Sequence, residues 1–281
     1  MRVAAIQFRS GLDKSANVAG LAALARDAAA RGAQLIVTPE MSTRLDRDRA
    51  RALNEAHSSL DEPAFQELAA LSAALNIFLL LGSAPFRVGA AALANRSILF
   101  GPTGAVLATY DKIHMFDVDL GEGETYRESA LYRPGETARL VDLGPAKLGL
   151  SICYDIRFAR LYLDLARAGA EIIAAPSAFT MPTGLAHWEI LLRARAIESG
   201  AFVIAAAQGG QHEDGRRTFG RSMIIGPWGE VIAALDHDRP DILLADLDLG
   251  AVAKARRAIP AWKTDQAFRS AIAEPPRDIG A

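Results

Sequence analysis

The 281-residue sequence contains a single cysteine, and this shortage excludes several classes of protein at once. One cysteine cannot form an internal disulfide framework, which favours a reducing, cytoplasmic setting. It cannot build a cysteine-based zinc site either, and the five histidines show no metal-ligand spacing. The sequence also has no glycine-rich phosphate-binding loop. We therefore expect neither a metal nor a cofactor.

Long apolar runs and a strong net charge are also missing. The longest apolar region, 68–81, is broken by Ser72 and Asn76, and the apolar part of the opening MRVAAIQFRS is too short for a signal peptide. We therefore expect no membrane span. The formal net charge of −2 gives no electrostatic reason to expect a nucleic acid or an anionic membrane as a partner. With 51% hydrophobic and 23% charged residues, the composition is that of a globular protein.

An internal repeat divides the chain into two related halves. GAQLIVTPE at 32–40 is echoed by GAEIIAAPS at 169–177, and RSILFGPTGAVLA at 96–108 by RSMIIGPWGEVIA at 221–233. Each half reads as apolar strands alternating with helices, followed by two strands joined by a Gly-Pro-x-Gly turn. Such alternation predicts α/β layers, and short continuous apolar strands are typical of sheets covered on both faces.

The predicted helices are Ala-rich and amphipathic, and glycines lie where their C-caps belong. They cover residues 16–31, 62–75 and 157–168, with Gly32 and Gly169 as the caps. Two halves that each need a partner for their sheet predict one domain, with two sheets packed face to face and helices outside. We assign this domain to residues 1–260. A polar, Pro-rich tail, 261–281, is expected to run over its surface.

Three residues with chemically useful side chains fall where a predicted strand ends or a loop begins. Glu40 follows the apolar strand LIVTP, at the carboxyl end where α/β sheets place their ligands. Cys153 precedes a helix that begins near Arg157, so we expect an exposed thiol whose pKa is lowered by helix N–H groups. Lys112, one of five lysines, opens the aperiodic stretch 111–135. Loops of that length inside a domain are often functional.

These three residues supply the groups that acyl transfer needs, which are a nucleophile, a base and an oxyanion stabiliser. Ser177 takes the repeat position of Glu40, as expected for one active site on a duplicated scaffold. Each residue taken singly also has a structural interpretation. Glu40 could cap a helix, Lys112 could be a solvated loop charge, and Cys153 could be a small buried apolar residue.

At these residues the sequence resembles the nitrilase superfamily of carbon–nitrogen hydrolases, in order from about residue 2 to 260. The matching motifs are TPEM around Glu40, YDKIHMFDVD around Lys112, GLSICYDIRF around Cys153, PSAFTMPTGLAHWEILLRARAIE at 176–198 and MIIGPWGEV at 223–231. The resemblance implies an α/β fold, a four-layer α-β-β-α sandwich with an internal pseudo-twofold duplication. It also implies a homodimer of two stacked sandwiches.

The resemblance also implies how the site works. Glu40 would be the general base, Lys112 the oxyanion stabiliser and proton donor, and Cys153 the nucleophile that forms an acyl-cysteine. A second active-site glutamate of the family maps onto Glu128 in YRES, where it would hold Lys112 and orient the substrate amide. The backbone N–H of Tyr154 would be a further oxyanion donor. Apart from the resemblance, Glu128 reads as an exposed loop carboxylate.

Within the superfamily, the sequence is most similar to amidases of α-keto-acid amides. One branch acts on deaminated glutathione, and its sister branch, the omega-amidases, acts on α-ketoglutaramate. AAAQGGQHEDGRRTFG at 205–220 resembles the deaminated-glutathione branch, but Arg221 stands where that branch usually has His, which leaves the finer substrate assignment open. Both substrates carry a keto-carboxylate, which Arg157 could bind in a bidentate manner. A structural ion pair with Asp155 or another acid is the alternative role of Arg157.

Two further substrate contacts are expected before the helix that GLAHWE starts. Phe179 and Thr183 lie in the loop that precedes it, whereas His187 and Trp188 begin the helix and pack beneath that loop. Aromatic and hydroxyl side chains at such positions also serve packing and capping.

Three functions therefore compete. They are a deaminated glutathione amidase, an omega-amidase or another amide, carbamoyl or nitrile hydrolase of the superfamily, and a catalytically silent dimeric binding scaffold. The complete Glu-Lys-Cys set argues against the scaffold. For an enzyme of this kind the expected partner is a small amide substrate.

Overall fold

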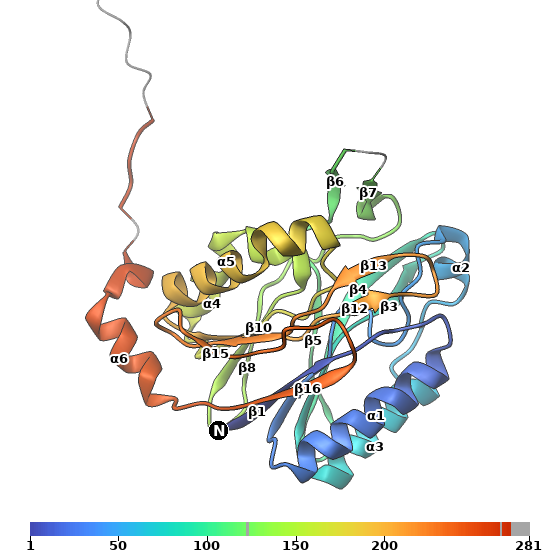
Figure 1. Cartoon of the computed structure of the whole chain (residues 1–281), viewed down its shortest axis with the longest axis horizontal. Coiled ribbons are helices and arrows are strands. Elements are labelled where there is room, and N and C mark those ends of the chain that lie inside the picture. The colour runs from blue at the N-terminus through green and yellow to red at the C-terminus, as the bar shows by residue number, and fades with distance from the viewer. Residues whose placement is uncertain (122–123, 265, 271–281) are drawn as a thin grey trace, which may run out of the picture.

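Two six-stranded sheets form the centre of the fold (Figure 1). The structure is a computed structural model that describes residues 1–121, 124–264 and 266–270. The first sheet runs in the order β16 (Asp241–Asp246), β1 (Arg2–Gln7), β2 (Leu35–Val37), β3 (Phe78–Gly89), β4 (Ala92–Phe100) and β5 (Val106–Asp111). The second runs in the order β15 (Val231–Ala234), β14 (Met223–Ile225), β11 (Phe202–Ala205), β10 (Ile172–Ala174), β9 (Lys147–Leu150) and β8 (Arg139–Asp142).

Helices cover the outer face of each sheet (Figure 1). The first sheet carries α1 (Lys14–Ala30) and α3 (Pro63–Leu75), and the second carries α4 (Ala159–Ala168) and α5 (Met181–Ser199). The remaining helices are α2 (Arg49–Asn54), α6 (Gly250–Ala258) and the 3₁₀ turns η1 (Glu128–Ala130), η2 (Cys153–Arg157) and η3 (Pro260–Lys263). In the described part of the chain, two two-stranded sheets complete the fold, β6 (Asp117–Asp119) with β7 (Thr125–Arg127) and β12 (Gly209–Gln211) with β13 (Arg217–Phe219).

The predicted duplication is visible in the strand pairing. In the first sheet β1, β2 and β3 are parallel, and β16, β4 and β5 extend them with antiparallel pairs. In the second sheet β9, β10 and β11 are parallel, and β8, β14 and β15 extend them in the same way. The four-layer α-β-β-α sandwich is thus confirmed. The outermost strands β16 and β8 had no counterpart in the sequence prediction.

Successive side chains along each strand alternate between two separate layers of the hydrophobic core. In β1, Val3 and Ala5 point into the cluster shared with the second sheet, whereas Ala4 and Ile6 point into the cluster beneath α1 and α3. Successive side chains of a strand face opposite sides, so a continuous apolar run covers both layers. This is the physical reason for the apolar runs in the sequence.

The helix ends follow local rules. The Asp13 carboxylate caps α1 by accepting hydrogen bonds from the N–H groups of Ser15 and Ala16, and the predicted helix 16–31 is observed as α1. The predicted helix 157–168 begins two residues later, because η2 occupies the turn before it. Gly169 ends α4 in the left-handed conformation with φ 109°.

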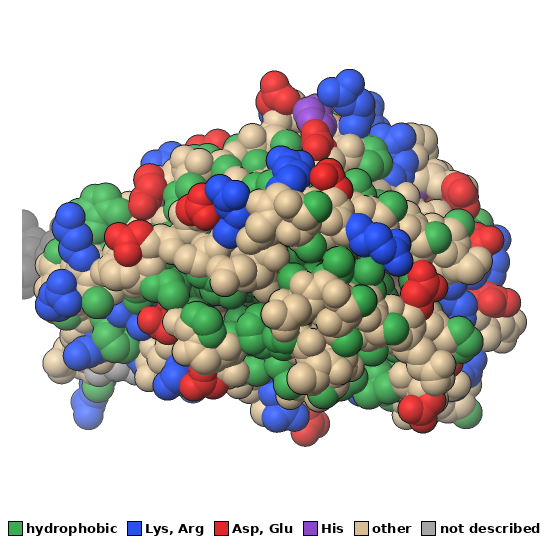
Figure 2. All heavy atoms as spheres, turned by 90° about the horizontal axis from the view of Figure 1, so that it is seen from below, with side chains coloured by type: hydrophobic (Ala, Val, Ile, Leu, Met, Phe, Trp, Pro, Cys, Tyr) green, Lys and Arg blue, Asp and Glu red, His purple; other side chains and the backbone are tan. Residues whose placement is uncertain are grey.

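The C-terminal part of the chain is only partly described. The predicted surface tail, 261–281, begins within η3, and residues 265 and 271–281 lie outside the described residues. Among the helices that the structure describes, none is long and apolar enough to cross a membrane. On the face seen in Figure 2, basic and acidic side chains are interspersed rather than grouped by sign.

Candidate active site

The ends of the two sheets bring Glu40 and Cys153 into one site. Glu40 follows β2 of the first sheet, and Cys153 follows β9 of the second. The Glu40 carboxylate crosses between the sheets, where its Oε2 accepts a hydrogen bond of 2.9 Å from the N–H of Ala178. The Gln208 side chain donates to the Glu40 carbonyl oxygen at 2.9 Å, which fixes the backbone as well. No helix begins at Glu40, so its interpretation as a helix cap is wrong.

Lys112 lies between two carboxylates. Its Nζ donates to Glu40 Oε1 at 2.9 Å and to both oxygens of Glu128, at 2.8 and 3.1 Å. The lysine is only 2% exposed, so its interpretation as a solvated loop charge is wrong. Burial would lower the pKa of Lys112, but the carboxylates of Glu128 and Glu40 raise it well above its ordinary value. The ammonium group is therefore held in its charged form.

Glu128 is positioned by the loop that the sequence left without periodicity. It opens η1, directly after β7, and its Oε2 accepts the N–H of Phe116 at 2.7 Å. The side chain points inward to Lys112, so the structure does not support its reading as an exposed loop carboxylate.

Asn95 is a polar member of the site that the sequence prediction missed. Its Nδ2 donates to Glu40 Oε1 at 2.8 Å and to Glu128 Oε1 at 3.1 Å, so it joins the two carboxylates. Asn95 lies in the middle of β4 and is fully buried. An amide inside the strand ALANRSILF was the available signal, because a buried amide needs partners.

The backbone at Cys153 adopts a conformation that non-glycine residues rarely take, with φ 47°. Such a conformation costs on the order of 1–3 kcal/mol and persists only where the surroundings enforce it. The Cys153 N–H donates to the Pro176 carbonyl at 2.9 Å. Asp155 accepts the N–H of Ile152 at 2.8 Å and thereby holds the turn from the other side.

The expected exposure of the thiol is wrong, since Cys153 is only 8% exposed. The expected lowering of its pKa is wrong as well. Burial and the adjacent Glu40 carboxylate raise the pKa of Cys153 well above its ordinary value, although Lys112 and the N–H of Ala178 act in the opposite direction. The resting thiol is therefore neutral, and it lies beside a carboxylate that can accept its proton.

Asp155 is a buried carboxylate that braces the cysteine turn. Its oxygens accept hydrogen bonds from the Tyr110 hydroxyl at 2.7 Å and the His114 N–H at 3.0 Å, and the His114 ring nitrogen lies at 2.7 Å. These contacts occupy Asp155 fully and connect the turn to the start of the 111–135 loop. The alternative ion pair between Arg157 and Asp155 is therefore wrong.

The site opens into a cavity of ≈ 420 Å³, within the range of small-molecule sites. All the predicted site residues line it: Glu40, Lys112, Glu128, Cys153, Tyr154, Arg157, Phe179 and Thr183. The guanidinium of Arg157 lies 5.7 Å from the ring centres of both Tyr154 and Phe179. Among the described residues it has no carboxylate partner, and its Nη2 lies 3.2 Å from the His187 ring.

Two details of the predicted substrate loop differ from the structure. Thr183 lies in the first turn of α5, which begins at Met181, so it is not in the loop before the helix. His187 and Trp188 accordingly lie further along α5, although Trp188 does pack against Phe179, with ring centres 4.8 Å apart. The helix starts early because Pro182 suits a first turn.

Arg221 lies outside the cavity lining and is exposed. Its guanidinium lies 5.1 Å from the ring centre of Phe219, and its carbonyl accepts the indole N–H of Trp188 at 2.8 Å. Any influence of this residue on substrate choice would have to pass through these packing contacts.

The motifs around the site match a known family. The sequence model described as Carbon-nitrogen hydrolase matches residues 2–257. The chain belongs to this family. It is therefore a hydrolase that acts on carbon–nitrogen bonds, and the family match spans both sheets and every site residue named above.

Three known proteins illustrate what this carbon–nitrogen hydrolase resembles. Human deaminated glutathione amidase is 40% identical over 270 residues, which cover 93% of this chain and 81% of the human one. The NitFhit protein of C. elegans has a TM-score of 0.87 at 33% identity, and the match covers 94% of this chain but only 65% of the worm chain. A mutant amidase of Nesterenkonia sp. AN1, which shows Michael addition of acrylamide at its active-site cysteine, has a TM-score of 0.77 at 26% identity, covering 92% and 98%.

Proposed function

We propose that this hydrolase is a cysteine-dependent amidase of α-keto-acid amides, with deaminated glutathione as its preferred substrate. The observation that carries the proposal is the buried cluster in which Lys112 joins Glu40 and Glu128 beside the Cys153 thiol. A binding scaffold would have no need to bury this charged set together with a strained cysteine. The name of the human relative supports the choice of substrate.

In the first half of the proposed reaction, Glu40 accepts the thiol proton while the sulfur of Cys153 attacks the amide carbon. The carbonyl oxygen gains negative charge, which Lys112 Nζ and the backbone N–H of Tyr154 would stabilise, at about 3–4 kcal/mol for each donor. Tyr154 is the second residue of η2, so its N–H has no acceptor within that turn.

Collapse of the tetrahedral intermediate breaks the carbon–nitrogen bond. The proton on Glu40 passes to the leaving nitrogen, so the amine departs neutral and an acyl-cysteine remains. Glu40 then takes a proton from water, whose oxygen attacks the thioester; the carbon–sulfur bond breaks, the acid product leaves, and the proton returns from Glu40 to the Cys153 sulfur. Glu128 and Asn95 would keep Glu40 and Lys112 in place through both halves.

Arg157 is the proposed anchor for the keto-carboxylate. It lines the cavity four residues after Cys153, and no described carboxylate pairs with it. Phe179 and Thr183 would line the same part of the cavity. Arg157→Ala should lower kcat/KM for deaminated glutathione and α-ketoglutaramate alike. The loss of transition-state stabilisation should be roughly 2–3 kcal/mol, since the site is partly desolvated.

The proposed substrate preference is tested by following α-ketoglutarate, the product that both substrates release. In deaminated glutathione the scissile bond is a substituted amide, so the second product is a dipeptide amine rather than ammonia. We expect both compounds to be hydrolysed, with the higher kcat/KM for deaminated glutathione. A higher value for α-ketoglutaramate would place this chain with the omega-amidases.

The homodimer implied by the family resemblance is also proposed, and an exposed apolar surface supports it. On α5, Leu185 and Ile190 are 69% and 70% exposed, and Trp228, in the turn between β14 and β15, is 59% exposed. Ile197 packs against Gly229 in the same turn, which connects the helix face to Trp228. Ile190 and Ile197, seven residues apart, share one face of α5, and contiguous exposed apolar residues of this kind mark interaction sites.

Sedimentation at micromolar concentration tests the assembly, because one chain has a mass of 30.0 kDa. Wild type should sediment as two chains. Ile190→Lys should shift the sedimenting mass toward that of one chain. Val88→Lys, at an exposed apolar position on β3, should leave the mass unchanged. A wild-type mass of one chain would contradict the dimer.

The proposed domain and compartment follow from the same features. One catalytic domain spans residues 1–260, since the family match ends at 257 and both sheets lie within it. We place the enzyme in the cytoplasm, because its only cysteine is the proposed nucleophile and works as a reduced thiol.

A further inference from the structure

The cavity wall carries more basic than acidic side chains. Apart from Lys112 and its two glutamates, the described lining residues include six arginines but only two acids. The arginines are Arg47, Arg49, Arg127, Arg157, Arg216 and Arg217, and the acids are Asp46 and Glu124. Such an imbalance favours an anionic ligand and raises its local concentration.

Most of these arginines already have partners. Arg216 is paired with Asp214 at 2.6 Å, and Arg217 lies 3.6 Å from Asp238. Arg127 donates to the carbonyls of Val118 and Tyr126, and Arg49 donates to that of Arg127. With Arg157 assigned to the keto-carboxylate, one cation of the wall is left over.

That cation is Arg47. Its side chain is exposed, and no carboxylate of the described residues lies within ion-pair distance of it. Its Nη1 lies 3.8 Å from where a Cβ on Gly215 would be, so the guanidinium rests against the turn between β12 and β13. Arg47 thus faces the cavity from the segment after β2, whereas Arg157 faces it from the turn after β9.

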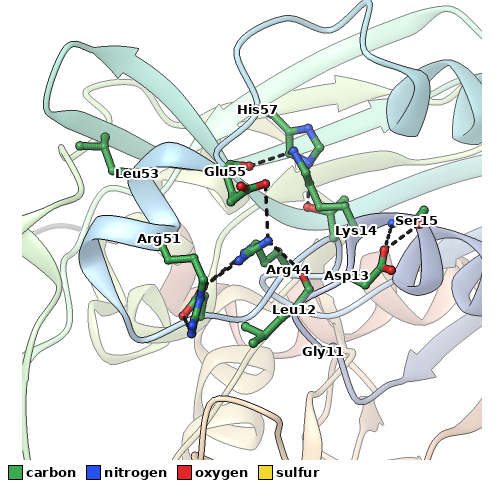
Figure 3. Close-up of polar contacts among 12 residues, drawn as sticks. Gly11, Leu12, Asp13, Lys14, Ser15, Arg44, Arg51, Leu53, Glu55 and His57 are labelled. Atoms are coloured by element: carbon green, nitrogen blue, oxygen red, sulfur yellow. Dashed lines mark hydrogen bonds and ion pairs between the residues drawn. The ribbon is translucent and has the colours of Figure 1, made fainter.

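A partly buried ion network holds the backbone next to Arg47, and Figure 3 shows its members Leu12, Arg44 and Arg51. Arg44 donates to the carbonyl of Leu12 at 2.7 Å and to Asp46 at 3.0 Å. Arg51 donates to the same Asp46 oxygen at 2.6 Å and to the other Asp46 oxygen at 2.8 Å. Because Asp46 directly precedes Arg47 and its side chain is almost fully buried, the segment is held, while no described carboxylate pairs with the Arg47 side chain. Since the backbone is already held, only the Arg47 side chain has to be ordered when it binds an anion, which lowers the entropy cost.

We propose that Arg47 is a second carboxylate anchor, which binds the free C-terminal carboxylate of the peptide part of the substrate. This inference rests on the proposed function, in which Arg157 binds the keto-carboxylate at the other end. Deaminated glutathione carries one carboxylate at each end, whereas α-ketoglutaramate carries only the keto-carboxylate. Arg47 would therefore select acyl-dipeptides with a free C-terminus over simple amides.

The test compares three substrates, all followed through α-ketoglutarate. They are deaminated glutathione, its C-terminal amide, which lacks the second negative charge, and α-ketoglutaramate. For Arg47→Gln we expect kcat/KM to fall about fivefold for deaminated glutathione, mainly through KM, since the anchor is exposed. The other two substrates should be unaffected. Arg47→Lys should restore most of the loss, because it keeps the charge.

Two controls separate a local contact from a general charge effect. Arg160→Gln removes one charge from α4, where the Arg160 side chain is 92% exposed and does not line the cavity. It should leave kcat/KM for all three substrates unchanged. In wild type, the preference for deaminated glutathione over its C-terminal amide should shrink as salt is added, because exposed charges are screened. In Arg47→Gln that preference should be absent at every ionic strength.

The activities of wild type and of Arg47→Gln distinguish a wrong second anchor from a wrong substrate. If wild type hydrolyses deaminated glutathione well but Arg47→Gln leaves it unchanged, or slows all three substrates alike, the second anchor is refuted and the proposed function stands. If wild type hydrolyses only α-ketoglutaramate, the proposed substrate is wrong, and the anchor is overturned with it.

Discussion

Removing the buried lysine should destabilise the fold as well as stop catalysis. Lys112→Met leaves the carboxylates of Glu40 and Glu128 close together without a cation, joined only through Asn95. Three charge-assisted hydrogen bonds are lost from a side chain that is almost fully enclosed. Breaking a buried ion pair from one side costs about 3–5 kcal/mol, and two stranded carboxylates favour the upper end.

The assay is urea unfolding followed by tryptophan fluorescence, with every variant at one protein concentration because association adds to stability. The matched variant is the double mutant Lys112→Met, Glu128→Gln, which removes one of the two stranded charges. It should be more stable than Lys112→Met by more than about 1 kcal/mol. The buried cluster of Lys112, Glu40 and Glu128 does not stabilise the fold in this way if the free energy of unfolding of Lys112→Met lies within about 1 kcal/mol of wild type. The same conclusion follows if the double mutant is no more stable than the single one.

Three further predictions concern protons. Alkylation of Cys153 should keep rising with pH above about 8.5, because burial and Glu40 raise the pKa of the thiol; a plateau near neutral pH would contradict this. Glu40→Gln should abolish turnover yet not slow alkylation at pH 7, because it removes both the base and the charge that raises the thiol pKa. Burial acts to raise the pKa of Glu62, but the hydrogen bonds from the Ser58 N–H and from His57 lower it from 4.5 to about 2. The ionised carboxylate therefore stabilises the fold above pH 4.5, and this contribution is lost as the pH falls toward 2. The free energy of unfolding of Glu62→Gln should depend less on pH in this window than that of wild type, and an equal pH dependence would contradict this.

The repeat and the strand patterns predicted most of the fold. The apolar runs around β2 and β10 marked the centres of both sheets, and Gly169 marked the end of α4 at the residue where it is observed. The edge strands β16 and β8 escaped prediction because both lie outside the repeated segments, and β8 has only two apolar residues in its RLVD. The partner of β16 is also distant in sequence, since β16 pairs with β1 at the other end of the chain, whereas β8 pairs with the adjacent β9.

The residue types of the site were predictable, but their environment was not. Glu40 and Cys153 stood out because each follows a predicted apolar strand, and Lys112 stood out because it opens the aperiodic stretch 111–135. The burial of the thiol depends on loops from both halves that close over it, and no local pattern around Cys153 records them. Asn95 was missed for the same reason, since its two carboxylate partners lie 55 and 33 residues away in the chain.

The most direct test of the proposed mechanism is mass spectrometry of the intact protein, quenched in acid during turnover. Wild type incubated with α-ketoglutaramate should carry one α-ketoglutaryl group, and digestion should locate it on the peptide that contains Cys153. Cys153→Ala should bind substrate, carry no adduct and release no α-ketoglutarate. Turnover by the Ala variant at the wild-type rate, or an adduct on any other residue, would contradict covalent catalysis by Cys153.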